Sequence, residues 1–201
     1  MARLLGLKQV PVFKETGDAK VTTEYGKNIK DYPTTGKTAD HNGLDLVRCS
    51  DGKSSQLANI VAIAAGEVIA VRKWVKGFRD TDATGGNCVH IKHANGMVTK
   101  YLHLKYATIP EEIVIGAKVK KGDLLGYMGA TGLAYGAHLH FQVEDEKGMP
   151  TDPEPYLKGE KDFGVKNEYV VEIGVFNEKE EAEKIQTALK ALGTDSTVKK
   201  V

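Results

Sequence analysis

Segments in which apolar and polar residues alternate with a period of two recur along this chain, and this period predicts β-strands. The clearest of them spans residues 138–143, directly after a glycine-rich loop. One face of this strand is expected to lie in the core and the other to be polar. The apolar set is Leu139, Phe141 and Val143, and the polar set is His138, His140 and Gln142.

The dipeptide Asn95-Gly96 predicts a β-hairpin, because Asn-Gly favours positive φ at both central positions of a two-residue type I′ turn. Counting outward from this turn pairs His90 with Tyr101 and Cys88 with His103 on one face. The other face holds nearly all the aliphatic residues and is expected to be the core. Its members are Val89, Ile91, His93, Val98, Leu102 and Leu104. Tyr101 and His103 are therefore predicted on the open face.

This register gives three histidines different predicted roles. His93 lies among the core aliphatics near the turn, so we expect a structural, hydrogen-bonded side chain. His90 shares the open face with His103 from the neighbouring strand, and we expect it to line a groove rather than to catalyse. His103 is the candidate for chemistry.

Other short strands and glycine turns extend this pattern on both sides of the hairpin. Residues 61–65 and 67–71 are predicted to form two strands around Gly66. The chain contains 22 glycines and few long helical patterns, which favours a turn-rich β protein. We therefore expect a mainly β fold, an antiparallel sheet or sandwich with an open groove.

The chain divides into four predicted parts. Residues 1–21 are expected to form an N-terminal arm, 22–157 the β domain, 158–167 a polar linker and 168–201 a small β-α-β unit. In the last part, Asn177 and Glu180 form a capping pair for a helix whose apolar stripe ends before a glycine. The stripe consists of Ala182, Ile185, Ala188, Leu189 and Leu192.

Composition and charge exclude several classes of protein. The 201 residues are 41% hydrophobic and 27% charged, as in a globular protein with a sizeable core. A net charge of +1 and the lack of a basic stripe with interleaved aromatics argue against a nucleic-acid partner. No membrane span is expected. The first apolar run is too short for a secretory signal, so we expect synthesis in the cytoplasm without a signal peptide.

Two cysteines, Cys49 and Cys88, are too few for a disulfide framework, and neither belongs to a CxxC motif. We expect both to be structural, and the sequence leaves open whether they pair.

Histidines and one aspartate suggest a metal site. The spacing of His138 and His140 lets one imidazole bind a metal while the other reaches a substrate beside it. Two half-exposed surface histidines are the simpler alternative. The distant segment 40–45 weighs against that alternative, because it adds His41 and Asp45, a third imidazole and a carboxylate.

Three motifs, taken in order, resemble those of the lysostaphin-type (LytM-like) zinc peptidoglycan endopeptidases. They are His41-x-x-x-Asp45, Tyr101-x-His103-Leu104 and His138-x-His140-Phe141. The similarity covers residues 22–157, and Gln142 departs from the glutamate common after the last motif.

This resemblance implies one Zn²⁺ per chain and assigns roles to residues of this sequence. His41, Asp45 and His140 would be the zinc ligands, and His103 and His138 the catalytic pair. Which of this pair is the base and which stabilises the oxyanion stays open. Residues expected to line the substrate groove are Tyr101, His90 and Asn42.

The C-terminal part resembles half of a SPOR peptidoglycan-binding module, with residues 169–176 as the matching run. A full module has two such repeats, so this unit is expected to bind the cell wall, to dock or to dimerise.

The expected function is therefore hydrolysis of a peptide bond in bacterial peptidoglycan by a zinc-activated water. We further expect a phage or prophage endolysin that reaches the wall through a holin-type lesion. The alternatives are a catalytically silent LytM-like regulator of another hydrolase and a zinc peptidase acting on small stem peptides. The sequence does not identify the bond that is cleaved or the host range.

Overall fold

A computed structural model of the chain describes residues 2–29, 39–50, 53–55, 58–77 and 83–164, together with helical residues 179–180, 183–184 and 187. The chain forms two compact units, Met1–Val165 and Lys166–Val201. Each is considered by itself.

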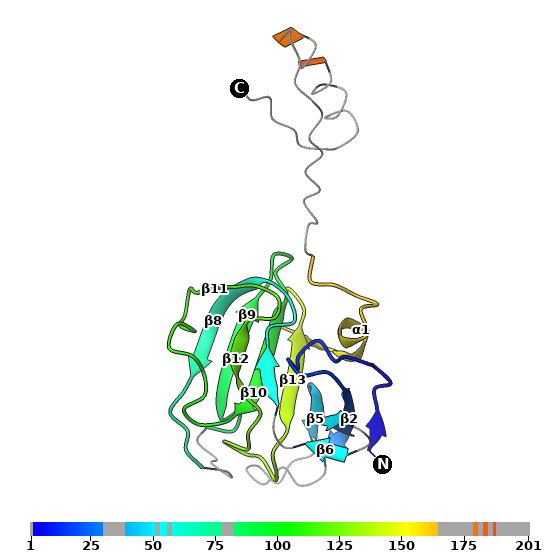
Figure 1. Ribbon diagram of the computed structural model, residues 1–201, viewed down its shortest axis with the longest axis vertical. Coiled ribbons are helices and arrows are strands. Elements are labelled where there is room, and N and C mark those ends of the chain that lie inside the picture. Colours follow the sequence, from blue (N-terminus) through cyan, green and yellow to red (C-terminus); the bar gives the residue numbers. More distant parts are fainter. Residues whose placement is uncertain are drawn as a thin grey trace. The chain divides into compact units, whose positions relative to one another are not determined.

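The described part of the first unit consists of short strands and one short helix (Figure 1). In chain order these are β1 (Arg3–Leu4), β2 (Asp18–Thr23), β3 (Asn28–Ile29), β4 (Ala39–Asp40), β5 (Leu44–Ser50), β6 (Lys53–Ser55), β7 (Asn59–Val61), β8 (Gly66–Arg72), β9 (Asn87–Lys92), β10 (Val98–Leu104), β11 (Lys118–Val119), β12 (Leu124–Tyr127), β13 (Leu139–Glu144), β14 (Pro150–Thr151) and α1 (Glu154–Leu157).

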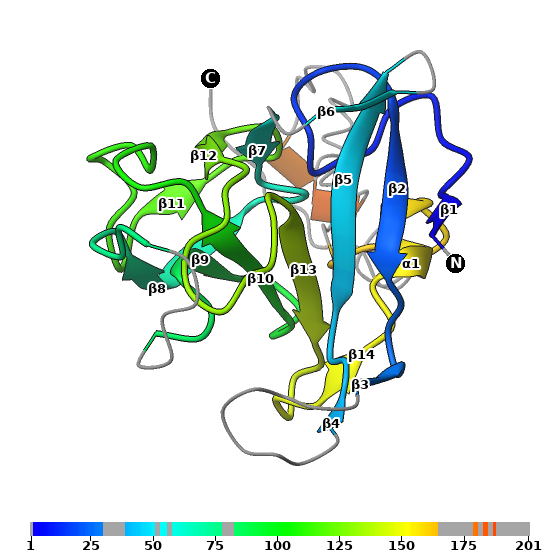
Figure 2. The same cartoon turned by 90° about the horizontal axis from the view of Figure 1, so that it is seen from below.

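One large sheet dominates the unit, with strand order β1-β2-β5-β13-β10-β9-β8-β11. Figure 2 shows its central strands side by side from β8 to β2. β14 pairs with β13 and β6 with β5, while β7–β12 and β3–β4 form two small sheets. All pairs of these strands are antiparallel. The predicted mainly β, antiparallel fold is confirmed.

The core lies on one face of the large sheet. Every second residue of β13 points into it, and Leu139, Phe141 and Val143 are fully buried as predicted. The same cluster contains Ile60 and Leu125 from the small β7–β12 sheet, which therefore packs on this face. Burial of each large apolar side chain contributes roughly 1.5–3 kcal/mol.

The hairpin of β9 and β10 forms, but the predicted register is wrong by one residue. Tyr101 lies opposite Val89, not His90. The N–H of His93 donates to the carbonyl oxygen of Met97 at 2.9 Å, so the loop has three residues and Gly96 takes a φ of +84°. Three-residue loops of this kind add a bulge to the hairpin. A one-residue slip transfers side chains to the opposite face.

The corrected register moves Tyr101 from the open face into the core. Its side chain has no exposed area, and its hydroxyl oxygen accepts the N–H of Ile63 at 2.9 Å. His93 is the structural residue that we predicted. Its Nδ1 donates to the carbonyl oxygen of Ala65 and its Nε2 contacts the hydroxyl of Thr99, both at 2.8 Å.

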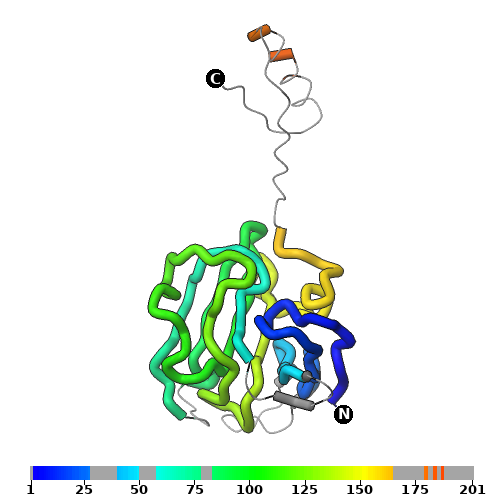
Figure 3. The backbone as a smooth tube through the Cα atoms, in the orientation of Figure 1, coloured from blue at the N-terminus to red at the C-terminus, as the bar shows by residue number. Residues whose placement is uncertain are grey.

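The first 21 residues lie in the same compact unit as the rest of the β domain rather than preceding it as an arm. β1 pairs with β2, and β2 pairs with β5 of the large sheet. Val12 and Phe13 are buried in the core. Arg3 also bonds Glu154 of α1, and the blue N-terminal segment runs beside the gold segment around this helix (Figure 3).

Of the two strands predicted around Gly66, the second forms as β8, whereas the first does not, because β7 ends at Val61 and residues 62–65 lie outside any strand. β7 pairs with β12 in a small sheet, whereas β8 pairs with β9 and β11 in the large one. The prediction missed this because sequence separation alone does not identify a strand's partner.

The chain leaves the domain later than the predicted linker suggests. Phe163 is buried, and its ring lies 4.7 Å from that of Tyr156 and 4.4 Å from that of His93. Part of the segment 158–167 therefore packs on the β domain.

The second unit is described only at a few helical positions. Lys179 pairs with Glu183 at 3.1 Å, and Glu180 with Lys184 at 3.3 Å. These pairs are spaced as neighbours on one helix face. The predicted strands and the apolar stripe of this unit lie outside the described residues. No helix in the described part of the chain is long and apolar enough to span a membrane.

The buried hydroxyl of Tyr101 gives a first prediction. Tyr101→Phe removes the hydroxyl oxygen that accepts the Ile63 N–H. We expect a loss of about 1–3 kcal/mol in the free energy of unfolding, because a buried donor loses its partner. Urea denaturation measures this loss. Unchanged stability together with weaker substrate binding would instead support the groove position that the sequence predicted.

Candidate functional site

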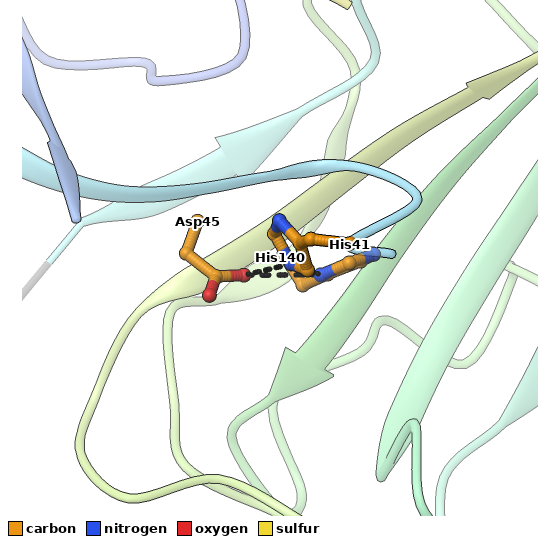
Figure 4. A group of neighbouring side chains, drawn as sticks. All are labelled: His41, Asp45 and His140. Atoms are coloured by element: carbon orange, nitrogen blue, oxygen red, sulfur yellow. Dashed lines mark hydrogen bonds and ion pairs between the residues drawn. The ribbon is translucent and has the colours of Figure 1, made fainter. Parts of the chain in front are cut away.

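Two strands and the turn before one of them bring His41, Asp45 and His140 together (Figure 4). Asp45 lies on β5 directly opposite His140 on β13. Opposite residues of an antiparallel pair project from the same face. His41 precedes β5 by a short turn and reaches the same point.

The three nearest polar atoms of this cluster form an almost equilateral triangle. Nε2 of His41 lies 3.0 Å from Nδ1 of His140 and 3.1 Å from Oδ1 of Asp45. Nδ1 of His140 lies 3.0 Å from the same oxygen. Ligand atoms at 2.0–2.1 Å from a tetrahedral Zn²⁺ lie about 3.3 Å apart, close to these separations.

Hydrogen bonding shows that this triangle needs a cation. Nδ1 of His41 lies 2.9 Å from the carbonyl oxygen of Glu24. A carbonyl oxygen only accepts, so this nitrogen carries the proton and Nε2 of the neutral ring carries a lone pair. That lone pair faces the carboxylate of Asp45, and two acceptors at this distance repel unless a proton or a metal ion lies between them.

The electrostatics of the ligands agree with this view. Burial raises the pKa of Asp45, but the hydrogen bonds from His140 and His41 together have a larger effect. The net result is a pKa well below the usual range of an aspartate. Asp45 is therefore ionised at neutral pH. Burial lowers the pKa of His41, yet the hydrogen bond and charge of Asp45 outweigh it and the net shift is upward. Metal binding would therefore displace a competing proton.

Gly43 allows the turn between His41 and Asp45 to lie against β13. A Cβ at this position would lie 2.6 Å from the carbonyl oxygen of Phe141 and 2.7 Å from Nε2 of His140. Both distances are shorter than a carbon contact allows. A side chain here would displace either the turn or the imidazole ring.

The two predicted catalytic histidines adjoin the metal-ligand cluster. The ring of His103 lies 4.7 Å from that of His138 and 6.0 Å from that of His140, between centroids. Nε2 of His138 is 3.5 Å from Oδ1 of Asp45. All five residues that the sequence assigned to metal binding and catalysis therefore lie in one cluster.

Backbone carbonyl groups set the tautomers of both catalytic candidates. Nδ1 of His103 donates to the carbonyl oxygen of Thr131 at 2.8 Å, and Nδ1 of His138 donates to that of Gly136 at 2.8 Å. When either ring is neutral, its Nε2 atom therefore carries the lone pair. Burial, and then the charges of His138 and His140, lower the pKa of His103 to about 3, so its ring is neutral at pH 7.

His103 has an unusual backbone conformation. Its φ is +62°, a region that non-glycine residues rarely adopt. The register of β9 and β10 shifts between Tyr101 and Leu104, so a bulge surrounds this residue. Such strain persists only where the surrounding structure enforces it, and it is enriched at functional sites.

The predicted groove residues separate in the structure. His90 pairs with Lys100, and Lys100 pairs with Gln142, so all three share the face that carries His140. Burial, with the charges of Lys100 and Arg72, lowers the pKa of His90 to about 4. Asn42 is exposed next to His41. Tyr101 points into the opposite, core face, so it does not line a groove on this one.

The sequence reasoning missed four residues that support the site. Three act through carbonyl oxygens, at Glu24, Thr131 and Gly136, and any residue type supplies a carbonyl. The fourth is Gly43. A glycine inside the His41-x-x-x-Asp45 motif is a sequence signal for close backbone approach.

The cysteines are both buried, and they lie on separate strands, β5 and β9, without a disulfide between them. Burial raises the pKa of the Cys88 thiol. This thiol is therefore protonated at neutral pH and is a poor nucleophile.

Comparison with known proteins identifies the kind of domain that carries this cluster. Residues 39–153 match the model of peptidase family M23. Two relatives from Vibrio cholerae, the peptidoglycan DD-endopeptidases ShyC and ShyB, are each 32% identical over 55% and 62% of this chain. The matches span 22% and 25% of those relatives, so the chain corresponds to about a quarter of their length.

A solved structure gives a similar result. The crystal structure of a zinc-containing peptidase from Vibrio cholerae is 31% identical, with a TM-score of 0.50. The match covers 67% of this chain and 35% of that one.

The contact at Gly43 yields a prediction for the metal site. Gly43→Ala should weaken zinc binding by one to two orders of magnitude, the usual effect of disturbing the support of a ligand, because the new Cβ pushes against His140 and Phe141. Metal analysis after dialysis against dilute zinc measures the retained ion. Gly77→Ala is the matched control, since nothing lies within 4 Å of a Cβ there. Full zinc retention by the Gly43 variant would contradict the geometry described above.

Proposed function

The chain belongs to peptidase family M23, and we propose that it hydrolyses peptide bonds of bacterial peptidoglycan with one Zn²⁺ held by His41, Asp45 and His140. The observation that carries this proposal is the triangle of ligand atoms next to two histidines whose Nε2 lone pairs are available. The substrate class is inferred from the names of the relatives, which are peptidoglycan endopeptidases.

The residues present fit a catalytic zinc site. Two neutral imidazoles and one carboxylate are a known ligand set, and three protein ligands leave the fourth position for a water or substrate. Zinc bound there supplies a Lewis acid that polarises the scissile carbonyl and lowers the pKa of a water molecule to roughly 7.

His103 and His138 divide proton transfer and oxyanion stabilisation between them. Each presents an Nε2 lone pair, so either can accept the proton that the attacking water loses and return it to the leaving amine. The other ring, once protonated, can stabilise the tetrahedral oxyanion. Hydrolysis by water requires no acyl-enzyme, which is consistent with the protonated, buried thiol of Cys88.

An active enzyme is favoured over the silent regulator that the sequence left open. A silent member of the family would be expected to lack one or more ligands or the proton-transfer groups. Here the three ligand atoms converge, and both additional histidines adjoin them.

Two groups of variants separate metal binding from proton transfer. Asp45→Ala and His140→Ala should lose zinc and activity together, because each removes a ligand. His103→Ala should retain zinc while turnover falls by about 10²–10⁴, the usual contribution of general acid–base catalysis. Metal analysis and release of wall fragments are measured on the same preparations. Loss of zinc from the His103 variant would refute the division of roles.

The substrate is tested with purified sacculi, defined cross-linked fragments and free dipeptides. We expect fragment release from sacculi that a chelator abolishes and added zinc restores. Mass spectrometry of the released fragments identifies the bond. Cleavage of dipeptides alone would favour the small-peptide zinc peptidase instead.

Other aspects of the expected biology stay predictions. Wall binding or dimerisation by residues 168–201, and release as an endolysin, rest on resemblance and sequence pattern. Sedimentation of the isolated protein with sacculi, with and without residues 168–201, tests whether this segment binds the wall.

A further inference from the structure

Thr131 connects the imidazole of His103 to the backbone of Leu104 and Asn87, which lie opposite each other on β10 and β9. Its side chain is buried, with 4% of its area exposed. Oγ1 donates to the carbonyl oxygen of Leu104 at 2.7 Å and accepts the N–H of Asn87 at 2.9 Å. The carbonyl oxygen of the same residue accepts the Nδ1–H of His103 at 2.8 Å.

Asn87 extends these contacts to the loop after β8. It has no exposed area, and its side-chain amide makes two bonds of 2.8 Å to Val75. Oδ1 accepts the Val75 N–H, and Nδ2 donates to the Val75 carbonyl oxygen. Because the backbone N–H of Asn87 is bonded to Thr131, this loop and the Thr131 peptide are held together.

His103 depends on this support because its backbone conformation is unfavourable for a non-glycine residue. Its N–H donates to the carbonyl oxygen of Gly85 at 3.0 Å. Gly86, which follows Gly85 in the chain, packs directly on Thr131. A Cβ on Gly86 would lie 2.2 Å from the Thr131 carbonyl oxygen. The carbonyl that orients the ring is therefore fixed from two sides.

From these contacts we propose that Thr131 is a positioning residue for His103. Its hydroxyl holds the peptide whose carbonyl keeps the ring in the Nδ1–H form, so that Nε2 is the nitrogen available to the substrate. This inference rests on the proposed function for the role of His103 as a proton acceptor. Its geometric part concerns only the ring and the peptide that holds it.

The test compares Thr131→Val with Thr131→Ser in the zinc-loaded protein. Valine has nearly the same shape but no hydroxyl, and we expect kcat on wall fragments to fall roughly 10- to 100-fold, as for other outer-shell hydrogen bonds. KM and zinc content should stay unchanged. Serine restores the hydroxyl and should recover most of the parent kcat. Should the valine variant not fold, Thr131→Ala provides the same comparison.

The chain offers a control for the hydroxyl contacts at Thr108, which is half-buried. Its hydroxyl donates to the carbonyl oxygen of Lys105 at 2.8 Å and accepts the N–H of Tyr127 at 3.0 Å. Thr108→Val thus removes the same two kinds of bond, and its carbonyl does not hold an imidazole of the site. We expect parent-like kcat from this variant. An equal loss of kcat at both positions would reduce Thr131 to a general structural residue and overturn the proposal.

Nitrogen-15 spectra of the histidine rings test the geometry without substrate. His103 should show the Nδ1–H pattern in the parent protein and a larger Nε2–H population in Thr131→Val. His93, whose Nδ1 donates to Ala65, is the internal reference. An unchanged His103 pattern would overturn the proposal. A parent protein that cuts no peptidoglycan would instead refute the proposed function, and the spectra would still decide the role of Thr131.

Discussion

The antiparallel pairing of β13 with β5 is the constraint on which the site depends. It sets His140 opposite Asp45, although 95 residues separate them along the chain. The neighbouring pair, Phe141 and Leu44, faces the core and is almost fully buried. Burial of these apolar side chains, roughly 1.5–3 kcal/mol each, fixes the register. Because a slip of β13 by one residue would turn His140 into the core, the apolar face determines the geometry of the polar one.

Backbone carbonyls then determine what the histidines can do. The carbonyl groups of Glu24, Thr131 and Gly136 each accept a hydrogen bond from an Nδ1–H group. In the proposed mechanism, this leaves Nε2 of His41 for a metal ion and Nε2 of His103 and His138 for catalysis. His93 shows the opposite arrangement, because both of its nitrogens are hydrogen-bonded inside the core. For His41, His103 and His138, the backbone carbonyl group that Nδ1 contacts determines that Nε2 faces the site.

Several features were predictable from sequence because they follow from local pattern. The period-two alternation of 138–143 predicted which face of β13 packs into the apolar core. The structural role of His93 also followed from its aliphatic neighbours, and the order of three short motifs indicated the family. The prediction of a two-residue turn at Asn95-Gly96 was wrong, because Asn-Gly also fits a three-residue loop with glycine in the left-handed region. That single difference moved Tyr101 from the expected groove into the core.

What the sequence by itself determined is therefore the set of chemical groups and the mainly β fold, since residue type and periodicity are local properties. The tertiary structure decided which groups meet and in what state. Strand partners, the bulge at His103 and the carbonyl groups that hold each ring depend on contacts between segments far apart in the chain. A carbonyl group is present at every residue, so no residue type marks the carbonyl groups that orient the histidine rings. Only the folded backbone selects them, and with them the nitrogen of each imidazole that is left for chemistry.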